Sequence, residues 1–280
     1  MDTKHQGERI IFVGGAPRSG TSMLQSMLDS HPEIFGGPEF DFIPAIINLR
    51  NQLLASINSG RIEAFCDNKQ VDRSFAELVE NLLLPAASHE KKRWLSEKTP
   101  MNILVFNQLL DIFPEARFIH VVRDPRAVAL SMLKVADRYR QKEMEPPAIV
   151  ANPRQVIQTI FQYISAGIEA SRVAPNRVHT IKYEKLLLNT EEETKDLCTF
   201  IGVDWSELML HPEEQSHISE SILVADGGLW SGDHKMYRGP EKWHMDKWKE
   251  GLTKQQLEEL AEVFRPVDMY RSLGYRFDDV

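Results

Sequence analysis

The feature that most constrains this chain is a glycine-rich turn between an apolar strand and an amphipathic helix. Gly15 and Gly20 are separated by four residues in the stretch GAPRSGTS, which follows a strand expected at residues 9–13 and precedes a helix expected at residues 21–29. Glycines in such a turn let backbone N–H groups converge, and the helix N-terminus adds partial positive charge. A strand, turn and helix in this order predict a phosphate-binding α/β fold, because context makes the glycine pattern informative.

The polar residues of the turn indicate what kind of group it binds. A turn that only joins a strand to a helix is the alternative, but Arg18, Ser19, Thr21 and Ser22 crowd this one and favour an anion. Thr21 stands where a Walker A loop carries the lysine that reaches the β/γ-phosphates of a nucleoside triphosphate. Arg18 is the cation that remains, and its forked guanidinium suits a terminal phosphate or sulfate group.

The rest of the chain alternates short apolar runs with longer helical periods, which is typical of a parallel α/β sheet. We therefore expect a three-layer P-loop-type α/β fold with a mostly parallel central sheet, formed by residues 1–280 as a single domain. Further strands are expected at 93–96, 117–122 and 177–183, and helices at 44–58, 73–87, 100–113, 125–135, 153 onward, 190–201 and 253 onward. Segments near 137–153 and 206–240 carry few periodic signals and are expected to be mobile.

Five of the expected helices have recognisable start signals. Thr99 and Asp124 each precede a proline, an arrangement in which the first residue caps the helix and the proline begins it, and Asn152-Pro153 opens the helix expected from residue 153. Thr190 is expected to cap a helix that Gly202 ends. Thr253 and Gln256 have the spacing of a capping box.

Charge and cysteine content exclude several classes of protein. The chain has 280 residues with a net charge of −8, the opposite of the balance expected for a nucleic-acid binder. Its two cysteines, Cys66 and Cys198, fall outside any CxxC or Cys/His cluster, so neither a disulfide framework nor a zinc site is expected. No apolar run approaches the ~18 residues of a membrane span. We expect a cytoplasmic chain; its oligomeric state is not predicted.

Two stretches carry a resemblance to a known family. Residues 11–32, IFVGGAPRSGTSMLQSMLDSHP, resemble the 5′-phosphosulfate loop of sulfotransferases that use 3′-phosphoadenosine-5′-phosphosulfate (PAPS), and are most similar to the tyrosylprotein sulfotransferases and their bacterial relatives. Residues 118–133, FIHVVRDPRAVALSML, are similar to the 3′-phosphate motif of that family. The resemblance implies PAPS as the sulfuryl donor, released as adenosine 3′,5′-bisphosphate.

The same resemblance assigns binding residues. The 5′-phosphate and sulfate would be held by Arg18, Ser19, Gly20, Thr21 and Ser22, and the 3′-phosphate by Arg123 and Ser131. For Arg123 and Arg126 the alternative is an ion pair with Asp124 at a helix cap. Tyr183, in VHTIKYEKL, matches a tyrosine that contacts the cofactor, with packing at an edge strand as the alternative. Arg238 lies ten positions before Trp248, as a cofactor-binding lysine does in the family, although Lys235 or Lys242 could serve instead.

Catalytic residues also follow from the resemblance. Sulfuryl transfer to a hydroxyl needs removal of the acceptor proton and stabilisation of charge at the bridging oxygen. Glu39, in GGPEFDFIP, falls on the family's catalytic glutamate and is the expected general base, against the alternative of a solvated loop carboxylate. Lys98, in SEKTP, falls on the lysine that stabilises the bridging oxygen. Glu39, Lys98 and Arg18 are thus the candidate catalytic residues.

The acceptor side departs from the family pattern. Tyrosylprotein sulfotransferases carry an arginine two positions after the catalytic glutamate, whereas this chain has Asp41, which would repel an acidic acceptor. A sugar, lipid, small-molecule or tyrosine hydroxyl therefore stays open as the acceptor. The aromatic residues Trp230, Tyr237, Trp243 and Trp248 could line an acceptor or adenine pocket or could pack under the 206–240 segment.

Two other functions remain as alternatives. One is a P-loop kinase of a small molecule, and the other is a nucleotide-binding protein without catalysis. Thr21 in the Walker lysine position argues against the kinase, and Glu39 with Lys98 argues against a non-catalytic protein. The nine histidines include no HExxH or comparable ligand spacing, so no metal is expected.

Overall fold

A central parallel sheet organises the protein. The structure is a computed structural model that describes residues 6–218, 229–230 and 245–277. Within these ranges the sheet has the strand order β2-β3-β1-β4-β5, and every pair of neighbours is parallel. The strands are β1 (Ile10–Gly15), β2 (Ile34–Gly36), β3 (Trp94–Lys98), β4 (Arg117–Val122) and β5 (Val178–Lys182). The expected α/β architecture is confirmed, and β1 lies at the centre of the sheet with β3 and β4 beside it.

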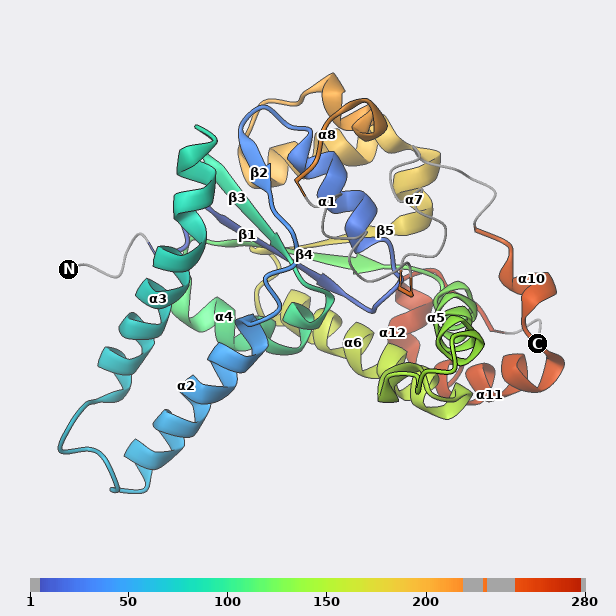
Figure 1. The fold of residues 1–280 in the computed structure, drawn as a ribbon, viewed down its shortest axis with the longest axis horizontal. Coiled ribbons are helices and arrows are strands. Elements are labelled where there is room, and N and C mark those ends of the chain that lie inside the picture. The colour runs from blue at the N-terminus through green and yellow to red at the C-terminus, as the bar shows by residue number, and fades with distance from the viewer. Residues whose placement is uncertain (1–5, 219–228, 231–244, 278–280) are drawn as a thin grey trace.

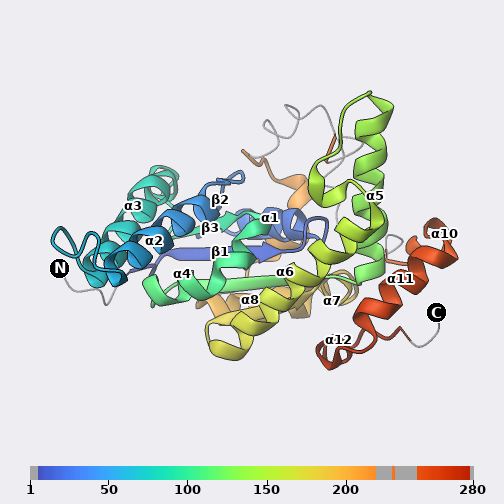
Figure 2. The ribbon, with the colours of Figure 1, turned by 90° about the horizontal axis from the view of Figure 1, so that it is seen from below.

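Helices cover both faces of the sheet (Figures 1 and 2). They are α1 (Thr21–Asp29), α2 (Ile43–Asn58), α3 (Asn68–His89), α4 (Phe106–Ile112), α5 (Pro125–Gln141), α6 (Pro153–Val173), α7 (Tyr183–Leu188), α8 (Thr190–Ile201), α10 (Trp248–Gly251), α11 (Lys254–Phe264) and α12 (Asp268–Ser272). Short 3₁₀ turns are η2 (Pro100–Val105), η3 (Ala148–Val150), η4 (Glu207–Leu210) and η5 (Pro212–Glu214). None of the helices in the described ranges is long and apolar enough to cross a membrane.

Alternating side chains of the buried strands divide the interior into two cores. Ile10 and Phe12 of β1 point into the larger core, which helices α2 to α6, α11 and α12 complete. Ile11 and Val13 point to the opposite face and pack with α1, α7 and α8. Because successive strand residues face opposite sides, an almost continuous apolar run in β1 is what a strand covered on both faces requires. Figure 1 shows α1, α7 and α8 on one side of the sheet and α4 and α6 on the other.

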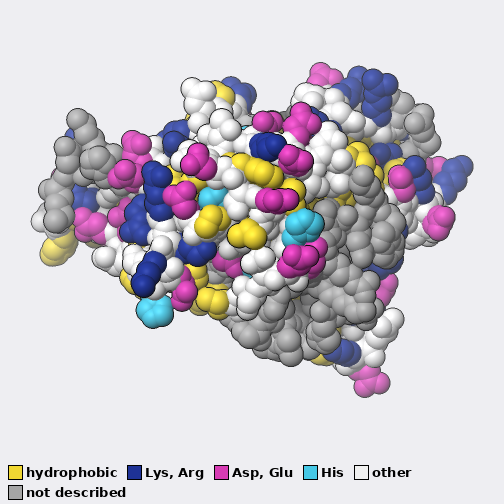
Figure 3. Space-filling model, turned by 90° about the horizontal axis from the view of Figure 1, so that it is seen from above, with side chains coloured by type: hydrophobic (Ala, Val, Ile, Leu, Met, Phe, Trp, Pro, Cys, Tyr) yellow, Lys and Arg dark blue, Asp and Glu magenta, His cyan; other side chains and the backbone are white. Residues whose placement is uncertain are grey.

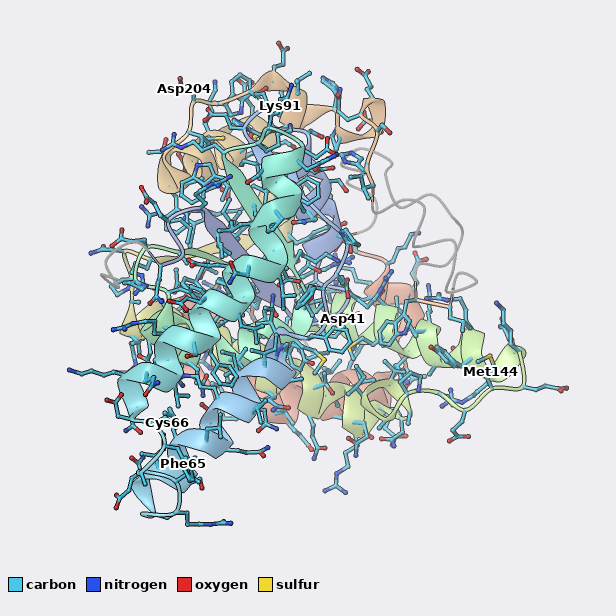
Figure 4. All side chains as sticks on the ribbon, turned by 60° about the vertical axis from the view of Figure 1, so that its left-hand side comes forward. Asp41, Phe65, Cys66, Lys91, Met144 and Asp204 are labelled. Carbon is cyan, nitrogen blue, oxygen red and sulfur yellow. The ribbon has the colours of Figure 1, made fainter. Side chains whose placement is uncertain are left out.

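Helices α2 and α3 pack side by side and extend away from the sheet (Figure 1). Ile57, Val71 and Phe75 form a small core of their own between the two helices. Figure 4 places Phe65 and Cys66 at the far end of this pair and Asp41 at the end nearest the sheet. The α2–α3 pair therefore begins beside the carboxyl ends of the strands, where its first residues belong to the site described below.

Several elements differ from the sequence-based prediction. Strand β2 was not expected, and α3 begins at Asn68, where Asp67 caps it by accepting from the Gln70 amide, and continues through an internal Pro85. Helix α5 runs on to Gln141, into the segment expected to be mobile. The mobility of 137–153 and of 206–240 stays a prediction.

The expected caps have mixed outcomes. Asp124 caps α5 through the Arg126 amide, and Thr253 forms its capping box with Gln256, as predicted. Gly202 ends α8 in the left-handed conformation, also as predicted. Thr99 stands at the cap position of η2, which Pro100 begins, as predicted, but its hydroxyl makes no capping hydrogen bond and donates to Glu97 instead. The Thr190 cap was wrong: Asn189 stands at the cap position of α8, and the Thr190 hydroxyl donates to the Leu186 carbonyl in the preceding helix.

The surface shows no single dominant sign of charge on the face that Figure 3 presents. Acidic and basic side chains are interspersed there, with a few apolar side chains between them. An interspersed surface of this kind is usual for a folded domain with a moderate net charge. The expectation that the chain does not bind nucleic acid stays a prediction.

A buried histidine makes stability depend on pH. His120 of β4 is fully buried, and neither of its ring nitrogens has a hydrogen-bond partner among the described residues. Helix α6 approaches the ring at Gly167, where an added Cβ would lie 2.3 Å from His120 Cε1. Desolvation lowers the pKa of His120 from 6.5 to about 3. The ring is therefore neutral in the folded protein at neutral pH.

We expect the free energy of unfolding to fall as the pH drops from about 6.5 towards 3. In this pH window His120 binds a proton in the unfolded chain but stays neutral in the folded protein. Protonation therefore favours unfolding, and the free energy of unfolding falls by at most about 5 kcal/mol at the lower end of the window. Urea unfolding between pH 7 and 4, compared with a His120→Phe variant, measures this contribution. Identical pH dependence in the two proteins would contradict the assignment.

Candidate active site

The candidate site lies at the carboxyl ends of the three central strands. Arg18 is in the turn after β1, Lys98 is the last residue of β3, and Arg123 follows β4. These strands are neighbours in the sheet, so the structure brings together three cations that are far apart in the sequence. The chain leaves β1 towards β2 and leaves β4 towards β5, in opposite directions, and the carboxyl ends at such a point are the usual ligand site of open α/β sheets.

The turn after β1 has the backbone of an anion-binding loop. Arg18 has a positive φ of 72° and Gly20 one of 103°, and Gly20 directly precedes α1. The Ser19 side chain is 1% exposed, and its hydroxyl has no hydrogen-bond partner within the described part of the chain. The first N–H groups of α1 have no carbonyl partner inside the helix. A phosphate or sulfate oxygen would satisfy both the Ser19 hydroxyl and these N–H groups, so the residues present fit such a group.

The two predicted phosphate motifs contact each other. Arg18 Nε donates to Ser131 Oγ of α5 at 3.1 Å, and an Arg123 N–H donates to the Arg18 carbonyl at 3.2 Å. The Arg123 guanidinium lies 4.3 Å from the centre of the Tyr183 ring. A Cβ at Gly20 would lie 2.3 Å from the same ring. Arg18, Gly20, Arg123, Ser131 and Tyr183 therefore form one contiguous group.

Tyr183 and Arg126 pack closely around the glycine turn and the start of α5. Tyr183 is the first residue of α7 at the carboxyl end of β5, and is 8% exposed against the glycine turn. Arg126 forms an ion pair with Asp124, at 2.7 Å. The guanidinium of Arg126 also lies 3.9 Å from the Trp248 ring centre, so Trp248 packs on this pair.

Glu39 and Lys98 form the second half of the site. The Glu39 carboxylate makes an ion pair with the Lys98 ammonium, which also donates to Ser22 Oγ at 3.3 Å. The Lys98 side chain is 7% exposed and that of Glu39 is 40% exposed. The carboxylate is thus held by a buried cation yet open to solvent, and Ser22 links the pair to the glycine turn.

A buried carboxylate beside this pair was missed by the sequence analysis. Glu97 is 3% exposed and accepts hydrogen bonds from the Thr99 hydroxyl at 2.6 Å, from the Phe40 amide at 3.2 Å and from the Asn102 side chain. Burial raises the pKa of Glu97, and these three donors oppose that rise. The signal available in the sequence was an acidic residue directly after the strand expected at 93–96 and directly before Lys98.

Asp41 lies two residues beyond Glu39 with a positive φ of 62° (Figure 4). Its amide donates to Thr99 Oγ1 at 3.2 Å. Partial desolvation, and then the neighbouring Glu39 carboxylate, raise the pKa of Asp41, whereas Lys98 acts in the opposite direction. Glu39, Asp41 and Lys98 therefore bring two carboxylates and one ammonium together in this part of the site.

Some predicted residues lie elsewhere or outside the described ranges. Arg238, with its alternatives Lys235 and Lys242, falls outside the described residues, as do Tyr237 and Trp243. Trp230 is described, and its carbonyl accepts from Arg138 at 3.1 Å. The adenine-pocket hypothesis for these aromatic residues stays a prediction.

Fold and site together define an α/β protein with a glycine turn that fits a phosphate or sulfate group. A model of the sulfotransferase family matches residues 10–207. The protein-tyrosine sulfotransferase of Drosophila melanogaster is 31% identical over 269 residues, which cover 95% of this chain and 51% of that protein. The chain belongs to the sulfotransferase family, and it spans about half the length of the Drosophila relative.

Solved structures agree on the fold. The sulfotransferase domain from the curacin biosynthetic pathway aligns with a TM-score of 0.60 at 18% identity, covering 93% of this chain and 98% of that one. A mouse sulfotransferase complexed with PAP aligns with a TM-score of 0.56 at 16% identity, covering 96% of this chain and 89% of that one. The predicted fold class is thus that of known sulfotransferases.

Proposed function

We propose that this chain, acting as a single domain, transfers a sulfuryl group from PAPS to an acceptor hydroxyl and releases adenosine 3′,5′-bisphosphate. The observation that carries the proposal is the contact between Arg18 and Ser131, which joins the two phosphate motifs, next to the Glu39–Lys98 ion pair. Bound PAPS would supply the activated sulfuryl group. Membership of the sulfotransferase family supports this reaction over the kinase and over a non-catalytic protein.

The residues of the chain have distinct roles in this proposal. Glu39 accepts the proton of the acceptor hydroxyl, since its carboxylate is solvent-accessible and fixed at one oxygen by Lys98. Lys98 holds positive charge where the bridging oxygen becomes negative. Arg18 and the N–H groups at the start of α1 hold the 5′ end of the donor. Arg123, Ser131 and Tyr183 hold the 3′-phosphate and the nucleoside, and Arg238 is proposed to bind the cofactor as well.

These roles need no metal ion, and we keep the prediction that none takes part. Ammonium and guanidinium groups supply the positive charge that a metal would otherwise bring to the transferred group. Transfer is therefore expected to continue in excess EDTA.

The acceptor is proposed by chemical class only. The relative from Drosophila is a protein-tyrosine sulfotransferase, which keeps tyrosine among the candidates with sugars, lipids and small molecules. Asp41 beside Glu39 disfavours an acceptor with acidic groups near its hydroxyl, because like charges at short range repel. A panel of neutral, cationic and acidic hydroxyl compounds with PAPS tests this point, and a preference for acidic peptides would contradict it.

Binding of the product tests the donor site without an acceptor. Arg123→Ala is expected to weaken binding of adenosine 3′,5′-bisphosphate about 10- to 100-fold, because a charge-assisted contact to the 3′-phosphate is lost. Binding of 5′-AMP should change little. Calorimetric titration measures both, with Arg172→Ala as a control that removes an exposed arginine paired with Glu169. Tighter binding of ATP with magnesium than of the bisphosphate would favour the kinase instead.

A further inference from the structure

The segment between β2 and α2 is held in place by side chains from the end of β3. Two consecutive amides of this segment, those of Phe40 and Asp41, donate to Glu97 Oε1 and to Thr99 Oγ1, each at 3.2 Å. Asp41 also adopts a left-handed backbone conformation, which costs a residue other than glycine energy unless its surroundings stabilise it. The Glu97 and Thr99 side chains bind this backbone at residues 40 and 41, and Gln25 of α1 donates to it further back, at the Gly37 carbonyl.

The hydrogen bonds from the Asp41 amide through the Thr99 hydroxyl all donate towards the buried Glu97 carboxylate. The Asp41 amide donates to the Thr99 hydroxyl, whose own proton is then donated to Glu97 at 2.6 Å. Asn102 donates to the other Glu97 oxygen. All three contacts of Glu97 are donors, which is the arrangement that stabilises an ionised carboxylate in a buried position.

The Glu97 side chain and the Lys98 side chain, which pairs with Glu39, lie on opposite faces of β3. Glu97 and Lys98 are successive residues, so their side chains point to opposite faces of the sheet. Lys98 reaches Ser22 of α1, whereas Glu97 reaches Asn102 of η2. The Glu39 side chain therefore meets Lys98 while the backbone just after it is bound to Glu97 and Thr99.

We propose that Glu97 and Thr99 are positioning residues that fix the backbone of residues 39–41, so that the Glu39 carboxylate stays beside Lys98. The inference rests on the proposed function, because Glu39 is the proposed base. Neither residue touches the reacting atoms. Their effect on the reaction comes through the place and orientation of Glu39, which proton abstraction requires to be correct within a fraction of an ångström.

A matched pair of variants at Thr99 tests the proposal. Thr99→Val keeps the shape but removes the hydroxyl, and Thr99→Ser keeps the hydroxyl. Thr99→Val is expected to lower kcat about tenfold or more, with the affinity for adenosine 3′,5′-bisphosphate unchanged within about twofold. Thr99→Ser should retain kcat close to that of the unmodified protein. Glu97→Gln, which replaces an acceptor oxygen with a donor, is expected to behave like Thr99→Val.

Amide hydrogen exchange supplies a readout that does not depend on turnover. In Thr99→Val the Phe40 and Asp41 amides should exchange faster, while the amides of β1 keep their protection. Glu80→Gln is the control, because Glu80 also accepts from a backbone amide, that of Gly7, at the opposite end of β1. This control should leave both kcat and the exchange of Phe40 and Asp41 unchanged.

Three results would overturn the proposal. These are an unchanged kcat in Thr99→Val, unchanged exchange at Phe40 and Asp41, or a loss of protection throughout β1 that shows a general effect on folding. Failure of the proposed function looks different. An unmodified protein that neither binds adenosine 3′,5′-bisphosphate nor uses PAPS would contradict the function, whereas the exchange experiment would still decide whether Glu97 and Thr99 hold the 39–41 backbone.

Discussion

Replacing Glu39 by glutamine is expected to lower kcat for sulfuryl transfer by about 10²- to 10⁴-fold. The amide has nearly the same shape as the carboxylate and can still accept a hydrogen bond from Lys98, but it does not take up the acceptor proton. Binding of adenosine 3′,5′-bisphosphate should stay within about twofold, because Glu39 contacts Lys98 and not the phosphate motifs. Single-turnover rates with PAPS, together with calorimetry, separate these two effects.

Asp41→Asn is the matched comparison for this variant. Asp41 is the other carboxylate on the acceptor side, two residues away, so it is the alternative base. If Glu39 is the base, Asp41→Asn keeps most of the rate and Glu39→Gln does not. The reverse result, or a rate that neither change lowers, would show that proton abstraction has been assigned to the wrong group.

Replacing Gly20 by alanine is expected to destabilise the protein by about 2–5 kcal/mol. A left-handed backbone costs a residue with a Cβ about 1–2 kcal/mol, and forcing that Cβ into the Tyr183 ring adds a packing cost of about 1–3 kcal/mol. Adenosine 3′,5′-bisphosphate binding should weaken as well, because Tyr183 packs on Arg123. Urea unfolding and calorimetry measure the two effects.

Gly202→Ala separates backbone strain from the clash. Gly202 also has a positive φ, of 87°, but a Cβ there would have no atom within 4 Å among the described residues. It should therefore show only the cost of the left-handed backbone. Adding Tyr183→Ala to Gly20→Ala should remove much of the difference between the two glycine variants. Equal destabilisation by both single variants would mean that the contact with Tyr183 is unimportant.

The sequence predicted best the parts of the protein that local patterns determine. The strand, glycine turn and helix around Gly15 and Gly20 were confirmed because apolar periodicity and turn residues act over a few positions. Strand β2 was not predicted, since three residues are too few to show a period of two. The end of α5 was placed too early because charged residues on an exposed helix face look much like a loop in the sequence.

In the candidate site, too, the residues in local sequence motifs were predicted, and the contacts between distant parts of the chain were not. Arg18, Arg123 and Ser131 were predicted by resemblance, and the structure adds that Arg18 contacts both of the others. The Glu97–Thr99–Asn102 contacts were not predicted, because they arise only when the backbone near Phe40 approaches the end of β3. Thr99 was expected to cap a helix, and tertiary contact with Glu97 gives its hydroxyl a different partner.

The central place of β1 has a consequence for how the protein is made. A chain is synthesised from its N-terminus, so β1 leaves the ribosome long before the strands that flank it. Ile10 pairs with Leu95 of β3 and Ile11 with Arg117 of β4, and neither partner exists when β1 first emerges. Such distant pairing slows folding and exposes an apolar strand in the interim. The glycine turn attached to β1 thus acquires its final surroundings only after β4 has been synthesised and has docked.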